Sequence, residues 1–206
     1  MRTVPPIEVE SFRILRSRVD TSTLPPLTRA VVERLIHTSA DVGYLTDVVT
    51  DEDALVAGRA ALLAGAPLVT DVTMVAAGVA RRDLTGPVIC EVASPDAAAL
   101  AADAGITRSA AAIRLVARRV GPGAVYAVGN APTALFELLS LDARPALVVG
   151  LPVGFVGAAE SKAALRASGL PQISNVSSKG GSPLAAAAIN ALLYSAPDER
   201  DEEHTR

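Results

Sequence analysis

The sequence predicts an α/β protein, in which helices cover both faces of a parallel β-sheet and a helical extension precedes it. Short β-branched, apolar runs alternate along the chain with helix-like segments. These runs are apolar throughout, as is typical of parallel strands buried on both faces. The runs at 124–128 and 146–149 each lead into glycine, a loop and a helix-like segment, which indicates a βαβ succession. The class predicted is therefore a three-layer sheet protein.

The elements follow from the apolar periodicity and from the prolines and glycines that bound it. Strands are expected at 67–71, 87–92, 124–128, 146–149 and 170–176. Helices are expected at 7–19, 28–41, 52–63, 72–80, 97–104, 110–120 and 183–193, and after the loops 129–133 and 150–157. Residues 45–49 fit a short strand or a turn, and Asn130 is expected to cap the helix that follows it.

Length and composition favour one domain, which we expect over residues 1–195. Half of the 206 residues are apolar, enough for a large core. Residues 196–206 are almost wholly charged and are expected to be a disordered tail. The net charge of −3 offers no basic surface for nucleic acid. Cys90 is the single cysteine, and no secretory signal or membrane-spanning run is evident, so we expect a soluble cytoplasmic enzyme.

The sequence carries no nucleotide-binding or zinc-binding motif, so no cofactor and no metal are expected. It does carry glycine-rich loops at 129–133, 150–157 and 180–182, each before an expected helix. Helix N-termini present free N–H groups and suit an anionic ligand. Lys179 opens the last of these loops, and Arg108 stands at an expected helix start, where it could reach a bound anion.

His37 is the only histidine outside the charged tail. It comes late in the second expected helix, where it can share a face with three charges: Glu33 and Arg34, four and three residues before it, and Asp41, four residues after it. The ordinary interpretation is a half-exposed histidine on a polar face. In the functional interpretation, the helix C-terminus and the two carboxylates favour imidazolium, the form that a general acid needs.

Several strings identify a family. They are E-S-F at 10–12, L-I-H at 35–37, D-V-T-M-V-A-A-G at 71–78, G-N-A-P-T-A-L at 129–135, P-V-G-F-V-G-A-A-E-S-K at 152–162 and K-G-G-S at 179–182. Together they resemble the precorrin-8X methylmutase family over nearly the whole chain apart from the charged tail. In the last string the family commonly carries basic residues before the lysine, where this chain has Ser177 and Ser178.

The resemblance implies an isomerase of cobalamin biosynthesis with a flavodoxin-like sheet. Its reaction moves a methyl group from C-11 to C-12 of the precorrin-8X macrocycle and gives hydrogenobyrinic acid. Such a shift within one molecule needs one acid, and the resemblance assigns that role to His37. It also associates Ser11 and Arg108 with the site. Members of the family are homodimers with the active site near the subunit interface.

The substrate is a large, flat macrocycle with a fringe of carboxylates, which the helix starts and glycine loops would bind. The expected substrate contacts are Ser11, Thr107, Arg108, Asn130, Thr133, Gly154, Lys179, Gly180 and Gly181. Three alternatives stay open. One is the same shift on cobalt-precorrin-8, giving cobyrinic acid. Another is a non-catalytic tetrapyrrole carrier, and the most distant is an α/β enzyme acting on a phosphorylated metabolite.

Overall fold

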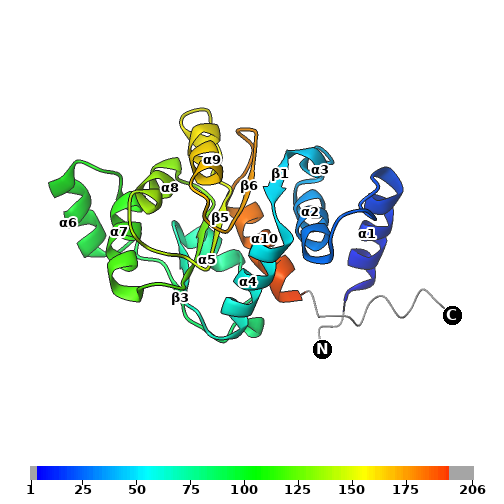
Figure 1. Ribbon diagram of the computed structural model, residues 1–206, viewed down its shortest axis with the longest axis horizontal. Coiled ribbons are helices and arrows are strands. Elements are labelled where there is room, and N and C mark those ends of the chain that lie inside the picture. Colours follow the sequence, from blue (N-terminus) through cyan, green and yellow to red (C-terminus); the bar gives the residue numbers. More distant parts are fainter. Residues whose placement is uncertain (1–3, 195–206) are drawn as a thin grey trace.

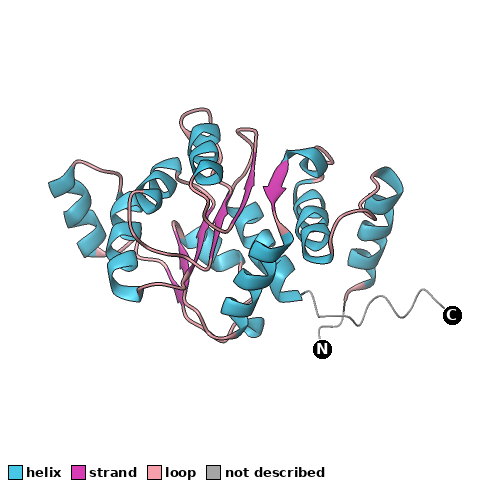
Figure 2. Ribbon diagram, in the orientation of Figure 1, coloured by secondary structure: helices cyan, strands magenta, loops and turns pink. Residues whose placement is uncertain are grey.

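A computed structural model describes residues 4–194 and confirms the α/β class. A six-stranded sheet with the order β1-β6-β5-β4-β2-β3 lies between two layers of helices (Figures 1 and 2). Without β1, this order is the 2-1-3-4-5 arrangement of flavodoxin-like sheets. The strands are β1 (Val48–Thr50), β2 (Leu68–Thr70), β3 (Val88–Ile89), β4 (Val125–Val128), β5 (Leu147–Gly150) and β6 (Gln172–Asn175).

The helices follow the expected segments closely, with boundaries that differ by a few residues. They are α1 (Pro6–Arg18), α2 (Pro26–Ser39), α3 (Tyr44–Asp47), α4 (Glu52–Leu63), α5 (Thr73–Gly78), η1 (Arg81–Asp83), α6 (Pro95–Ala104), α7 (Arg108–Val120), α8 (Pro132–Leu139), α9 (Ala158–Ala167) and α10 (Ser182–Tyr194). Proline stands in the first turn of α1, α2, α6 and α8, where its missing N–H has no helical partner to lose.

Two apolar cores lie on the two faces of the sheet, and strand β4 contributes to both. Val125 and Ala127 face the core formed with α2, α4, α5 and α10, whereas Tyr126 and Val128 face the core formed with α7, α8 and α9. All four residues are fully buried. This arrangement explains why the strand sequence is continuously apolar rather than alternating.

The sheet departs from the prediction at one edge. Residues 45–49, which fitted a strand or a turn, form the end of α3 and the start of β1. Strand β1 pairs antiparallel with β6, with Val49 opposite Ser174, so the sheet is not wholly parallel. Antiparallel edge strands are common on otherwise parallel sheets, and β1 at this edge is only half-buried.

The charged tail at 196–206 lies outside the described residues, and the single domain over 1–195 remains a prediction. Within residues 4–194 no helix has both the length and the apolar character needed to cross a bilayer.

Candidate active site

Flavodoxin-like sheets usually bind ligands where the strand order reverses, here between the carboxyl ends of β2 and β4. In this protein the backbone donors at that position bind the protein's own Asp71 carboxylate. The fully buried Asp71 follows β2, and its carboxylate accepts the backbone N–H groups of Gly129, Asn130 and Ala131 at 3.0, 2.8 and 2.8 Å. Burial raises the pKa of Asp71, against the three amides, which lower it.

This contact corrects two expectations about the first glycine loop. Asn130 does not cap α8, because Ala131 is the N-cap residue and makes no side-chain cap bond. The three backbone donors at 129–131 are also already bound to Asp71, so they are not free for a substrate carboxylate. The side chain of Asn130 is exposed. The signal for this arrangement was an aspartate placed directly after a buried strand.

Asp71→Ala should destabilise the fold. It would leave three backbone N–H groups without their acceptor, and we expect the free energy of unfolding to fall by about 2–4 kcal/mol. Urea denaturation followed by circular dichroism measures this change. Asp71→Asn, which keeps one acceptor oxygen, should lose less. An alanine variant as stable as the parent protein would contradict the role assigned to this carboxylate.

The structure brings Ser11 and His37 together across the α1–α2 pair. Ser11 Oγ lies 2.8 Å from His37 Nδ1, and both residues are partly buried. The ring of Phe12 stacks on the imidazole with centroids 5.0 Å apart and planes 13° apart. The guanidinium of Arg34 lies 4.9 Å from the Phe12 ring centre and forms an ion pair with Glu8 at 2.8 Å. The imidazole is therefore held by its ring face and by one nitrogen.

The electrostatic prediction for His37 is wrong. Burial lowers the pKa of His37 below its ordinary value, and the Arg34 cation lowers it further, while Glu8 raises it. The two carboxylates expected to raise that pKa are paired with nearer cations. Glu33 pairs with Arg16 at 2.8 Å, and Asp41 pairs with Lys179 at 2.8 Å.

This environment favours one tautomer of His37. Because the pKa of His37 is lowered from its ordinary value, the neutral imidazole is favoured over imidazolium in the free protein. We infer that the Ser11 hydroxyl then donates to Nδ1, which leaves the proton on Nε2. The Nε2–H is thus available as a donor to a bound molecule.

The second and third glycine loops lie side by side beyond β5 and β6. Gly181 N donates to Leu151 O at 2.8 Å, and Gly154 N donates to Ser178 O at 3.3 Å. From this pair of loops the Lys179 ammonium reaches Asp41, just after α2, and lies 5.1 Å from the ring centre of Tyr44. The ion pair with Asp41 raises the pKa of Lys179. The loops are therefore tied to the helix that carries His37.

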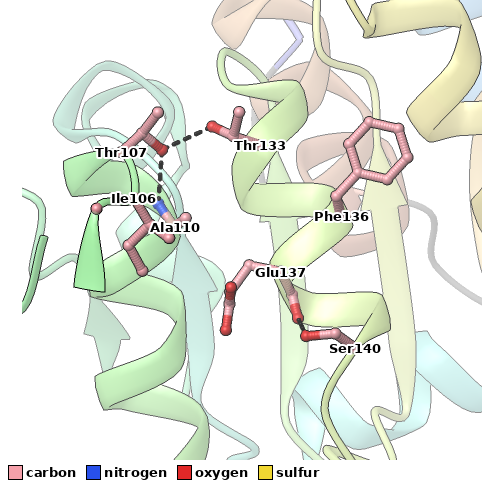
Figure 3. A pocket seen from close by; sticks show the side chains of 8 residues that line it. Ile106, Thr107, Ala110, Thr133, Phe136, Glu137 and Ser140 are labelled. Carbon is pink, nitrogen blue, oxygen red and sulfur yellow. Dashed lines mark hydrogen bonds between the residues drawn. The ribbon is translucent and has the colours of Figure 1, made fainter.

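Thr107 and Thr133 form a separate group at the start of α7 and α8. Their hydroxyl oxygens lie 2.7 Å apart, and Thr107 Oγ1 also accepts the N–H of Ala110 at 3.2 Å (Figure 3). Beside them is a cavity of about 400 Å³, lined on one side by Phe136. Arg108, the next residue of α7, is exposed, and none of residues 4–194 forms an ion pair with it.

The predicted site residues thus fall into two groups within one chain. Helix α2, with His37, packs against α1, α3, α4 and α10, whereas α7, with Arg108, packs against α6, α8 and β2. The two helices lie toward opposite ends of the long axis of the molecule (Figure 1). No motif in the sequence indicates this separation. Nor does any motif indicate the contact between Phe12 and His37, which depends on how α1 packs on α2.

The described part of the chain contains no cluster of three or more His, Cys, Asp or Glu side chains able to hold a metal ion. The fold and the site together define a flavodoxin-like α/β protein with a serine–histidine pair on its helical edge. A family model described as precorrin-8X methylmutase (CbiC) matches residues 6–195. The chain belongs to the precorrin-8X methylmutase family, a family of methyl-transferring isomerases in cobalamin biosynthesis.

Characterised relatives and a solved structure agree with the family model. The chain is 44% identical over 190 residues to the precorrin-8X methylmutase of a Sinorhizobium species, covering 88% of this chain and 90% of that protein. It is 41% identical over 196 residues to the cobalt-precorrin-8 methylmutase of Salmonella typhimurium, covering 91% and 93%. The crystal structure of the precorrin-8X methylmutase from Thermus thermophilus superposes with a TM-score of 0.83 at 37% identity, covering 92% of this chain and 96% of that chain.

Proposed function

We propose that this protein moves the methyl group of precorrin-8X from C-11 to C-12, with His37 as the general acid. The observation that carries the proposal is the Ser11–His37 pair, 2.8 Å apart, in a chain of the methylmutase family. The product would be hydrogenobyrinic acid.

We propose the cytoplasm as the compartment of this enzyme. Cys90 is a free cysteine, which suits a reducing compartment.

The chemistry needs little beyond one proton donor. In a [1,5]-sigmatropic shift the bond from C-11 to the methyl carbon breaks as the bond to C-12 forms, so no electrons enter or leave. A donor that protonates or hydrogen-bonds the conjugated macrocycle makes it more electron-poor and lowers the barrier. His37 Nε2–H is suited to this role. The carboxylates of a bound substrate would raise the pKa of His37 and favour imidazolium.

Substrate carboxylates would be bound by the cationic and glycine-rich groups around the carboxyl ends of the strands. The Lys179 ammonium pairs with Asp41 just after α2, and the loop that carries it adjoins Gly154. Thr107, Thr133 and Arg108 would supply a second set of contacts. The exposed Val153, Phe155 and Val156 would offer apolar surface to the macrocycle between these sets.

We further propose a homodimer with the active site at its interface. The support is the separation of α2, which carries His37, from α7, which carries Arg108, within one chain (Figure 1). In addition, no described residue forms an ion pair with Arg108. A two-fold axis would bring α2 of one protomer beside α7 of its partner, twice over. Ile7 and Val9 on α1 are exposed apolar residues that such an interface would cover.

The direct test is the absorption spectrum of the protein mixed with metal-free precorrin-8X and followed over time. We expect a change to the spectrum of hydrogenobyrinic acid. Conversion of cobalt-precorrin-8 alone would keep the reaction class but change the substrate, an alternative that the cobalt-precorrin-8 methylmutase of Salmonella typhimurium supports. Binding of both pigments without conversion of either would overturn the enzyme proposal in favour of a tetrapyrrole carrier.

A further inference from the structure

A hydrogen bond connects the only two lysines of this sequence, Lys162 and Lys179. Lys162, on α9, has 0% of its surface exposed, yet it carries an ammonium group. That group donates to the backbone carbonyl of Lys179 at 2.6 Å and to the side-chain oxygen of Asn175 at 2.8 Å. A buried cation is costly unless it is well paired with acceptors, so such a contact points to a specific role.

A second buried group holds the same segment from the other side. Asp47 accepts the amide N–H groups of Val176 and Ser177 at 3.0 and 2.8 Å. It also accepts the hydroxyl of Ser177 at 2.6 Å and the side-chain amide of Asn175 at 2.9 Å. Ser177, which departs from the family pattern, thus has a structural partner.

Burial lowers the pKa of Lys162 to about 8, so the Lys162 ammonium remains mostly charged at pH 7.

The segment so held is the loop 176–181, which carries Lys179 toward the end of α2. The C-terminal end of the loop packs closely against the residue that follows β5. At Gly180 the two backbones are so close that a Cβ would lie 2.3 Å from Leu151 O. The side chain of Lys179 is 43% exposed and makes its ion pair with Asp41 across the loop. Both ends of the loop 176–181 are therefore held by hydrogen bonds and close packing, while the Lys179 ammonium is exposed to solvent.

We propose that Lys162 is a positioning residue, which holds the loop 176–181 through the Lys179 carbonyl so that the Lys179 ammonium can bind a substrate carboxylate. This inference rests on the proposed function for the identity of the ligand. It assigns no contact between Lys162 and the substrate. Lys162 acts through the Lys179 carbonyl and through Asn175, whose side-chain amide donates to that same carbonyl at 3.0 Å.

The first arm of the test needs no ligand. In Lys162→Met, hydrogen–deuterium exchange of the amides at 176–181 should be at least about tenfold faster, while exchange in β5 stays unchanged. Arg166→Met is the matched control, because Arg166 lies one turn further along α9 and donates to Asn175 O at 2.8 Å without touching Lys179. This control should leave exchange at 178–181 unchanged. Unchanged exchange in Lys162→Met would overturn the proposal.

The second arm is a double-mutant cycle on the dissociation constant of hydrogenobyrinic acid. Lys179→Met and Lys162→Met should each weaken binding about tenfold, the loss of one charge-assisted contact. The double variant should also be weakened about tenfold, whereas independent effects would multiply to about a hundredfold and refute positioning. Arg166→Met should bind like the parent protein.

Two further outcomes are decisive. If Lys162→Met does not fold, Lys162→Gln replaces it, since its amide can still donate one hydrogen bond and should give intermediate values in both arms. Parent-like values for Lys162→Gln in both arms would then overturn the proposal. If the parent protein does not bind the pigment, the proposed function fails, and the exchange arm alone still decides whether Lys162 holds the loop.

Discussion

His37→Ala should abolish methyl migration while leaving the protein folded and able to bind hydrogenobyrinic acid. The variant removes the Nε2–H donor, and loss of a general acid costs about 10²–10⁴-fold in kcat. Because His37 is only partly buried and its ring contacts are with Phe12 and Ser11, we expect little loss of stability. The measurement is the rate of the spectral change at saturating precorrin-8X, with product binding determined in parallel.

The same assignment fixes a pH dependence. If imidazolium is the active form, kcat/KM is highest on the acid side and falls about tenfold per pH unit once the pH exceeds the His37 pKa. Burial and Arg34 hold that pKa below its ordinary value, while Glu8 opposes them. Arg34→Met should therefore move the midpoint to higher pH. A parent-like rate in His37→Ala would refute His37 as the acid. A flat profile from pH 5 to 8 that Arg34→Met leaves unchanged would refute imidazolium as its active form.

A heterodimer of two inactive variants should recover activity. One protomer would carry His37→Ala and its partner Arg108→Ala, each with a different affinity tag, so that only the mixed dimer is purified. If each site uses His37 of one chain and Arg108 of the other, one of the two sites is intact. We then expect about half of the parent activity. The assay is again the conversion of precorrin-8X.

The matched control is a doubly tagged dimer with His37→Ala in both chains, which should stay inactive. If His37 and Arg108 serve one site within a single chain, the mixed dimer contains no intact site and also stays inactive. That result, or a light-scattering mass near 21.1 kDa for the parent protein, would rule out the shared site.

Local signals determined most of the fold. The helix expected at 52–63 has those bounds, because Asp51 caps it by accepting the N–H of Ala54 at 2.8 Å. Strand β4 was found because it is buried on both faces and therefore continuously apolar. The sequence is ambiguous at the edge strand β1, since its three half-buried residues depend on pairing with β6, more than a hundred residues away.

The site was predicted less completely, and the reason is distance along the chain. Spacing along one expected helix put Glu33 and Asp41 beside His37, but α2 ends at Ser39, before Asp41. The two carboxylates pair instead with the cations Arg16 and Lys179. Those partners come from α1 and from the loop after β6. Family strings named Ser11, which the structure brings to His37, but no string indicates how far Arg108 lies from either.

Of the two lysine ammonium groups, only one is accessible to a reagent in solution. Lys162 is sealed between α9 and β6, whereas the Lys179 ammonium is open to solvent at the rim of the candidate site. Apart from the α-amino group, an acylating dye therefore has one lysine to label. Covalent tagging of the native sequence would thus put a probe beside the site without any introduced cysteine.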